Sequence, residues 1–328
     1  MEPKSTKAKA NLGPNLLKDL LLQKHLELAL DEVKREYEGL WCLPRITVDD
    51  KMGPATQENK RRRLETVNSE RVPAACLEVE NITVNHVLVK EDCIYFRNSE
   101  QSSLGVFLGT NNQKTITPPK STLLQGDITQ TLDVFKSSAP KFNLIVLDPP
   151  WPNRSARRKQ SYTISYGTSE IRALLSSIPF YDHLVDDGLI AVWVTNKPAF
   201  REMIVGQEGL FAEWGVQLIE EWIWLKVTSK GELICAMDST WRKPYEILLV
   251  GQRCEEILDE QVKRRVIVGV PDLHSRKPNL KTLFEGIMGN EEGRYEALEI
   301  FARNLTAGWW SWGNEVLKFQ MEEHWAES

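Results

Sequence analysis

Four consecutive residues, Asp148, Pro149, Pro150 and Trp151, place an acid, two prolines and an aromatic ring directly after the apolar run FNLIVL. Neither proline has a backbone N–H, so the pair cannot continue a strand ladder or an ordinary helix interior. The four residues therefore predict a rigid turn at the end of a strand. In open α/β sheets, ligands bind beyond the carboxyl ends of strands, which is where this turn would lie.

An acid and a carbonyl in such a turn suit methyl transfer to the exocyclic amine of adenine, a poor nucleophile whose lone pair is delocalised into the ring. Asp148 and the carbonyl of Pro149 could accept hydrogen bonds from both amine hydrogens as charge develops on nitrogen. Trp151 could stack on the base and hold it in line with a methyl donor. The alternative is a proline-stiffened turn with an incidental acid, and the position after a core strand favours the catalytic interpretation.

Near-continuous apolar runs after residue 115 are typical of strands that are covered on both faces. They predict an α/β sheet of about seven strands, with helices over 168–177 and 277–288 between some of them. The predicted strands are Asn143–Leu147, Leu189–Thr195, Gln217–Val227, Tyr245–Val250, Val266–Val270, Ala297–Phe301 and Glu315–Phe319.

Residues 1–114 have a different pattern and predict a smaller α+β domain. Its expected parts are an amphipathic helix over 15–41, a polar linker over 51–71 and strands within 82–109. The linker carries Lys60-Arg61-Arg62-Arg63, which fits a nuclear import signal or a nucleic-acid contact about as well as an ordinary solvated surface. The turn-rich segment TNNQKTITPPK marks the predicted boundary between residues 114 and 115.

Composition narrows the classes of protein that this chain can belong to. With 328 residues, of which 41% are hydrophobic, it can form one large domain and one smaller domain. Its apolar runs are too short to cross a bilayer and no signal peptide opens it, so we expect a soluble intracellular protein. The five cysteines and five histidines form no metal-ligand pattern, and no metal is expected. No G-x-G-x-x-G run supports a nicotinamide or flavin site.

The formal net charge is only −5, so a nucleic-acid contact would need a local basic patch. One such patch follows the D-P-P-W turn directly, in the segment NRSARRKQSY. It contains Arg154, Arg157, Arg158 and Lys159. Cations there would attract phosphates and make binding depend on salt, and this interpretation is favoured over that of a solvated loop.

Over Gln125 to Phe319 the chain resembles the MT-A70 family of adenine-N6 methyltransferases, whose catalytic motif is D-P-P-W. GDI, HSRKP, EIFARN and GWWSWGNE follow in the family order. Within the family, NHVLV, KPYEILLVG and the terminal EIFARNLTAGWWSWGNEVLKFQ are most similar to the methyltransferase-like protein 4 branch. The resemblance implies a Rossmann-like methyltransferase domain over 115–328 that uses S-adenosyl-L-methionine.

The resemblance also nominates site residues. Its catalytic residues are Asp148, Pro149, Pro150 and Trp151. Its cofactor-binding residues are Asp127, Ile128, Asp148, Pro150, Lys277, Arg303, Asn304, Asn314 and Glu315. Together with the basic segment, the substrate-binding candidates are Trp151, Arg154, Arg157, Arg158, Lys159, Trp224, Lys243, Tyr245 and Glu246. Each has a structural alternative: a helix cap for Asp127, a surface charge for Lys277, a core position for Trp224.

The resemblance predicts N6-methylation of adenosine in RNA, with 2′-O-methyladenosine in small nuclear RNA as the leading acceptor. The alternatives are methylation of DNA adenine and a catalytically silent RNA scaffold, and the intact motif residues argue against the scaffold. We expect RNA as the partner, no membrane, a monomer, and a nuclear location with the cytosol second. The chain departs from the branch at Arg276, where histidine is usual, and its SYGT run over 165–168 is more like the messenger-RNA subunit.

Overall fold

The computed structural model describes residues 16–42, 87–90, 93–108, 114–152, 167–239, 242–254, 261–272, 276–289 and 295–321. The chain folds as two compact units. Unit 1 comprises Met1–Leu43, Pro149–Ser177 and Asp186–Leu280, and unit 2 comprises Pro44–Asp148, Ile178–Val185 and Lys281–Ser328. Both units draw on segments that are far apart in the sequence, so neither is a simple amino- or carboxyl-terminal half.

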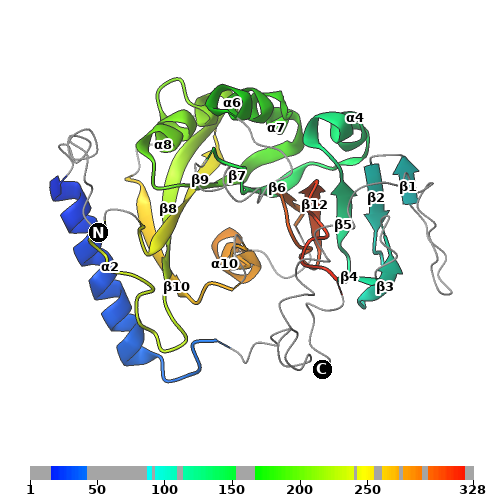
Figure 1. The fold of residues 1–328 in the computed structure, drawn as a ribbon. Coiled ribbons are helices and arrows are strands. Elements are labelled where there is room, and N and C mark those ends of the chain that lie inside the picture. Colours follow the sequence, from blue (N-terminus) through cyan, green and yellow to red (C-terminus); the bar gives the residue numbers. More distant parts are fainter. Residues whose placement is uncertain are drawn as a thin grey trace, which may run out of the picture. The chain divides into compact units, whose positions relative to one another are not determined.

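Unit 2 contains the parallel strands that precede the D-P-P-W turn. Its described elements are β1 (Val87–Lys90), β2 (Cys93–Arg97), β3 (Leu104–Phe107), β4 (Lys114–Thr117), β5 (Thr122–Gln125), α4 (Ile128–Ser138), β6 (Phe142–Leu147), α7 (Phe180–His183), α10 (Lys281–Met288), β11 (Ala297–Ile300) and β12 (Trp309–Gly313). The main sheet here runs in the order β1-β2-β5-β12-β11-β6, and Figure 1 shows β1, β2 and β5 side by side. The β5-β12, β12-β11 and β11-β6 pairs are all parallel.

The central strands form because they are apolar on both faces, as parallel strands require. In β6 five of six side chains are buried, and all five residues of β12 are buried. Helix α4 covers this sheet through Phe135, whose ring stacks on Trp312 with the centroids 4.1 Å apart. The Trp312 indole N–H also donates to Thr131 Oγ1 over 2.7 Å. The α/β class is thus confirmed, and the parallel core is consistent with a Rossmann-like methyltransferase domain.

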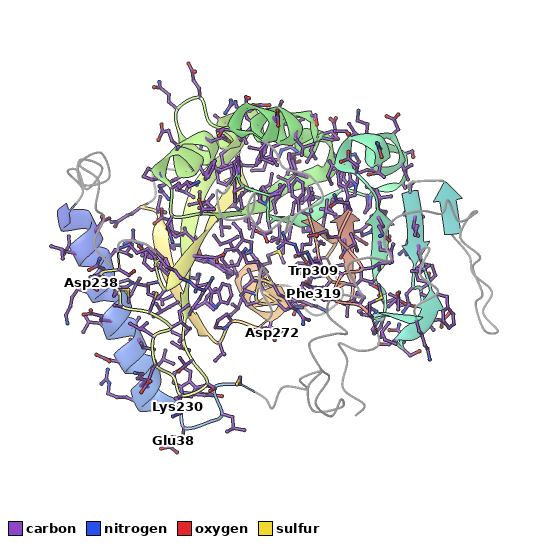
Figure 2. The ribbon with its side chains drawn as sticks, in the orientation of Figure 1. Glu38, Lys230, Asp238, Asp272, Trp309 and Phe319 are labelled. Carbon is purple, nitrogen blue, oxygen red and sulfur yellow. The ribbon has the colours of Figure 1, made fainter. Side chains whose placement is uncertain are left out.

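The predicted strand Glu315–Phe319 is wrong. The strand at this point of the chain is β12, which ends at Gly313, where φ is 147°. The residues that follow form turns, with Lys318 N donating to the Glu315 carbonyl over 2.9 Å. Val316 and Leu317 pack in a buried cluster with Phe96, so this turn is as apolar as a buried strand would be. Figure 2 labels Trp309 and Phe319, which are both buried in this unit.

The segment 82–109 contains the antiparallel hairpin β1–β2 and the strand β3, in agreement with the strand pattern. Strand β2 pairs antiparallel with β5, so strands from both sides of residue 114 share one sheet. The division of the chain into domains 1–114 and 115–328 stays a prediction. The linker over 51–71, with its run of four basic residues, lies outside the described residues.

Unit 1 is built around a second set of long, buried strands. Its described elements are α2 (Leu16–Glu36), α6 (Thr168–Ser177), β7 (Leu184–Val194, from residue 186 onward), α8 (Pro198–Val205), α9 (Leu210–Glu213), β8 (Val216–Lys226), β9 (Tyr245–Arg253) and β10 (Lys263–Gly269). The strand order is β7-β9-β8-β10. Strand β9 is antiparallel to both of its neighbours, and β10 is parallel to β8.

Helix α2 occupies residues 16–36 of the segment for which leucine spacing predicts a helix. Leu26 and Leu30, one turn apart, are buried against Ile223 and Leu225 of β8. The helix therefore packs on strands of unit 1, as Figure 1 shows, with α2 drawn in blue beside β8 and β10. No helix among the described residues is long and apolar enough to cross a membrane.

We predict that Phe135→Ala destabilises the protein by about 3–5 kcal/mol, because the buried ring leaves a cavity against Trp312. Urea denaturation followed by tryptophan fluorescence measures the change. Lys136→Ala is the matched control, since Lys136 is the next residue of the same helix and is exposed. Equal stability of the two variants would contradict the assigned packing of α4.

Candidate active site

In unit 2, Asp148 lies at the carboxyl end of β6, where the sequence places it. Its backbone N–H donates to the carbonyl of Ile300 over 3.3 Å, because β6 and β11 run parallel with Leu147 opposite Ile300. The Asp148 side chain is only 13% exposed. A largely buried carboxylate needs a partner, since burial without one is costly.

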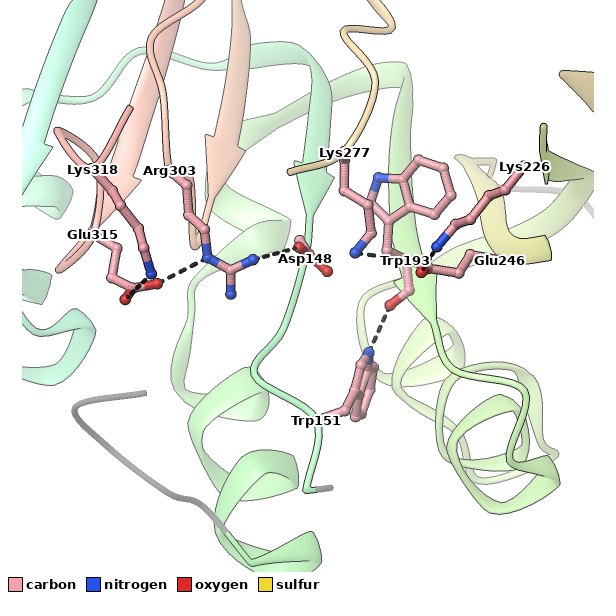
Figure 3. Close-up of polar contacts among 9 residues, drawn as sticks. All are labelled: Asp148, Trp151, Trp193, Lys226, Glu246, Lys277, Arg303, Glu315 and Lys318. Atoms are coloured by element: carbon pink, nitrogen blue, oxygen red, sulfur yellow. Dashed lines mark hydrogen bonds and ion pairs between the residues drawn. The ribbon is translucent and has the colours of Figure 1, made fainter. Parts of the chain in front are cut away.

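That partner is Arg303, three residues beyond the end of β11. Its Nη1 lies 3.4 Å from Asp148 Oδ2, and its Nε donates to Glu315 Oε2 over 2.8 Å. The guanidinium thus joins two carboxylates that are far apart in the sequence (Figure 3). Arg303 is 7% exposed, so these charges interact with limited screening by water.

Glu315 is held from a second side by Lys318, whose Nζ lies 2.8 Å from Glu315 Oε1. Burial by itself raises the pKa of the Glu315 carboxyl, but the hydrogen bonds and charges of Lys318 and Arg303 outweigh it and lower this pKa below its ordinary value. Glu315 therefore stays ionised at neutral pH and can accept hydrogen bonds from hydroxyl groups of a ligand.

The other nominated residues of unit 2 lie at the start of α4 or in the turns after β11 and β12. Asp127 caps α4, because its Oδ1 accepts from the backbone N–H of Thr129 over 2.9 Å, so the capping alternative describes what this carboxylate does in the structure. Ile128, the first residue of α4, is buried. Asn314 is exposed and Asn304 is half-buried.

The chain passes from unit 2 into unit 1 between Asp148 and Pro149. In unit 1 the turn closes on itself, with Trp151 N donating to the Pro149 carbonyl over 2.8 Å. A carbonyl oxygen has two lone pairs, so that of Pro149 can accept a further hydrogen bond. Pro150 is half-buried.

The Trp151 ring is fixed by its neighbours in unit 1. Its indole N–H donates to the carbonyl of Trp193 over 2.7 Å, and the ring stacks on Phe200 with the centroids 4.7 Å apart. The residue is 8% exposed. The orientation of the indole is therefore set before any base could bind.

A second charged cluster in unit 1 centres on Glu246, the second residue of β9. Its carboxylate pairs with Lys226 through Oε1 and with Lys277 through Oε2, the latter over 3.1 Å (Figure 3). Lys226 Nζ also lies over the ring of Trp224, and Lys277 Nζ over that of Trp193. Burial alone raises the pKa of Glu246, yet the charges of Lys277 and Lys226 lower it overall, below its ordinary value of 4.5.

The remaining substrate candidates contact the protein itself. Trp224 and Tyr245 are buried, with 3% and 8% exposure. Lys243 Nζ donates to the carbonyl of Met237 over 3.5 Å. Arg154, Arg157, Arg158 and Lys159 lie outside the described residues, so the structure does not test the basic segment.

Three residues that hold these clusters together are absent from the set nominated by the sequence. Trp193 accepts the indole hydrogen bond of Trp151, Lys226 pairs with Glu246, and Lys318 pairs with Glu315. Trp193 and Lys226 stand at or beside the carboxyl ends of β7 and β8. That position is a signal in the sequence, because ligands bind beyond strand ends in sheets of this kind.

Among the described residues, no group of three or more histidine, cysteine or acidic side chains could hold a metal ion. Unit 2 does carry acceptors at its strand ends. Asp127, Asp148 and Glu315 offer carboxylates there, and Gln125 Oε1, at the end of β5, is buried with no hydrogen-bond partner among the described residues. These hydrogen-bond acceptors suit a ligand made of a nucleoside and an amino acid. Its hydrogen-bond donors would be an adenine amine, ribose hydroxyls and an ammonium group.

Comparison with known proteins shows the family to which this chain belongs. The MT-A70 family model matches residues 142–315, which include the D-P-P-W turn and reach Glu315. The chain belongs to the MT-A70 family. MT-A70 adenine-N6 methyltransferases use S-adenosyl-L-methionine, and the acceptors at the strand ends of unit 2 fit that methyl donor.

Three relatives share much of the sequence. The chain is 53% identical to "N6-methyladenosine RNA methyltransferase MTA1" of Cryphonectria parasitica over 212 residues, which cover 64% of this chain and 62% of that protein. It is 40% identical to the protein of the same name from Pyricularia oryzae, over 93% of this chain and 74% of that protein. It is 37% identical to human "N(6)-adenine-specific methyltransferase METTL4", over 71% of this chain and 49% of that protein. The resemblance to the MT-A70 family is thereby confirmed, including its likeness to METTL4.

We predict that Glu246 stabilises the fold only while it is ionised. Because its folded-state pKa is lowered, this contribution is present above about pH 4.5 and is lost as the pH falls through the folded-state pKa. Urea denaturation from pH 7 down to about pH 3 should show Glu246→Gln clearly less stable than wild type above about pH 4.5, with the difference shrinking as the pH falls below that value. Glu232→Gln is the control, an exposed carboxyl in the same unit. A difference that stays constant with pH would show that the lysine pairing does not stabilise this unit.

Proposed function

We propose that this chain catalyses S-adenosyl-L-methionine-dependent methylation of the N6 amine of adenosine in RNA. The observation that carries the proposal is the D-P-P-W turn of an MT-A70 chain at the carboxyl end of β6, with its acid ion-paired to buried Arg303. Two relatives, at 53% and 40% identity, carry the name N6-methyladenosine RNA methyltransferase, which supports RNA over DNA as the acceptor.

The residues of the turn act on the acceptor amine in this proposal. Bound donor supplies an electrophilic methyl group. Asp148 accepts a hydrogen bond from the amine, and the pairing of its carboxylate with Arg303 keeps one oxygen oriented. The Pro149 carbonyl accepts the second amine hydrogen. Because both acceptors are preorganised, they stabilise the charge that develops on nitrogen without reorganising.

The finer proposal for the acceptor is 2′-O-methyladenosine in small nuclear RNA. It rests on the likeness to the METTL4 branch, which the 37% identity to the human protein supports. DNA adenine is the second candidate, because the name of that human relative specifies adenine without specifying the nucleic acid. An unpaired adenine is favoured over a paired one, since a paired base must first be flipped out of its helix.

We further propose that Arg154, Arg157, Arg158 and Lys159 contact the phosphates of the RNA, and that the chain works as a monomer in the nucleus. The support is in the sequence: four cations follow the catalytic turn, and a run of four basic residues lies at 60–63. Phosphate contacts of this kind make affinity fall steeply with salt.

Mass spectrometry of oligonucleotides incubated with S-adenosyl-L-methionine tests the function. Three matched sequences carry adenosine, 2′-O-methyladenosine or deoxyadenosine at the target position. We expect the 2′-O-methylated RNA to react fastest. Asp148→Asn should lower kcat by at least about 100-fold, because it removes a preorganised group that stabilises charge in the transition state. Calorimetry should show that the same variant still binds the donor.

Each alternative has its own result in this assay. Preference for deoxyadenosine would keep the chemistry and move the acceptor to DNA. Donor binding without methyl transfer to any oligonucleotide would support the scaffold alternative. Full activity of Asp148→Asn would remove the acid from the reaction.

We also predict that Lys277→Ala weakens donor binding by about 10- to 100-fold, as expected for loss of a charged hydrogen bond to a carboxylate. Lys226→Ala is the matched control, because Lys226 pairs with the same Glu246 carboxylate. If Lys277 contacts the donor, calorimetry shows a loss of affinity in Lys277→Ala that is much larger than in Lys226→Ala. Equal losses in both variants would assign Lys277 to the Glu246 cluster alone.

A further inference from the structure

We propose that Arg303 is a positioning residue for the catalytic acid: it fixes the carboxylate of Asp148 while Glu315 anchors the guanidinium from the other side. The inference rests on the proposed function, because Asp148 needs a fixed orientation only if it acts on an acceptor. It differs from the role that the family resemblance gives Arg303, which is contact with the methyl donor. Lys318, which the resemblance does not nominate, pairs with the other carboxylate oxygen of Glu315.

The guanidinium group of Arg303 contacts its two carboxylates through different nitrogens. Nη1 reaches Asp148 over 3.4 Å and Nε reaches Glu315 over 2.8 Å, so separate nitrogens of one planar group contact separate carboxylates. A guanidinium holds its donors in a fixed fork, unlike the rotating ammonium of lysine. Orienting Glu315 therefore orients the plane of Arg303, and through it the oxygen of Asp148.

Four charged side chains pair in sequence at this edge of unit 2. Asp148, Arg303, Glu315 and Lys318 alternate in sign, and their successive separations are 3.4, 2.8 and 2.8 Å. Exposure of the side chains rises toward the far end, from 7% for Arg303 to 20% for Glu315 and 38% for Lys318. The cation between the two acids is the most buried member. Removing it would leave two buried carboxylates without their shared partner, whereas removing Lys318 would expose Glu315 to solvent and leave Arg303 in place.

The backbone around Arg303 is held on both sides. Phe301 has φ of 61°, a left-handed conformation that is strained for a residue with a bulky side chain. It packs so closely on Gly313 that a Cβ there would lie 3.2 Å from the Phe301 Cα. On the other side, the backbone carbonyl of Arg303 accepts a hydrogen bond from the N–H of Phe319 over 3.0 Å. The surrounding structure thus holds a strained turn that aims Arg303 back toward Asp148.

The first half of the test is a double-mutant cycle on stability, which needs no activity. Unfolding by urea is compared for wild type, Asp148→Asn, Arg303→Gln and the double variant of the full chain. The inference predicts that the double variant is less destabilised than the sum of the two single variants, because each single change removes the same pairing. Additive effects would show that the two side chains do not interact in solution and would overturn the proposal.

The second half separates positioning from donor contact. Arg303→Gln should lower kcat by about 10-fold or more while the calorimetric Kd for S-adenosyl-L-methionine changes less than about 3-fold. Arg303→Lys, which keeps the charge and is the milder variant if Gln does not fold, should recover only part of kcat, because one ammonium cannot reproduce the fork. Arg172→Gln is the control: it breaks an arginine–glutamate pair on the surface and should change neither quantity.

Different results would contradict the positioning role of Arg303 and the proposed function. A large rise in Kd with kcat unchanged would make Arg303 a donor ligand and overturn the positioning role. Full rescue by lysine would show that charge alone matters and would also overturn it. If wild type methylates no oligonucleotide, the proposed function fails, and the stability cycle still decides whether Arg303 fixes Asp148.

Discussion

A buried cation between two carboxylates is the constraint on which the carboxyl edge of unit 2 depends. Arg303 joins the last residue of one segment, Asp148, to Glu315 beyond β12. Strands β6, β11 and β12 have to be in register for this to happen, because Asp148 follows β6, Arg303 follows β11 and Glu315 follows β12. Since an unpaired buried charge is strongly destabilising, the pairing favours a single register and holds the acid in one place.

Unit 1 uses the reverse arrangement, an anion between two cations. Glu246 lies between Lys226 and Lys277, and each lysine also lies over a tryptophan ring. The aromatic faces attract the ammonium groups while their surroundings limit hydration, so the lysine stems are held along the rings rather than in solvent. In both units, charged side chains that could serve a reaction are restrained by protein partners, which is the preorganisation that transition-state stabilisation requires.

Much of the architecture could be predicted from pattern. The near-continuous apolar runs at β6, β8 and β9 predicted strands within three residues of their observed limits, because strands buried on both faces have little freedom in composition. The strand predicted over 189–195 missed the first five residues of β7, which include the polar pair Asp186 and Asp187. The strand predicted over 315–319 was wrong, because its apolar residues are buried in turns. Burial alone selected its apolar residues, and burial does not distinguish a strand from a turn packed into a core.

The family, the position of D-P-P-W after an apolar strand and the chemical types of the residues beside it could all be predicted from the sequence, because they depend on local pattern and motif order. The tertiary fold was needed to show which distant side chains meet. It turned Arg303 toward Asp148 and added Trp193, Lys226 and Lys318 to the clusters. Asp148 and Arg303 are 155 positions apart, Trp151 and Trp193 are 42 apart, and Lys226 and Glu246 are 20 apart. No local pattern in the sequence specifies which distant charged side chain becomes the counterion of a buried charge.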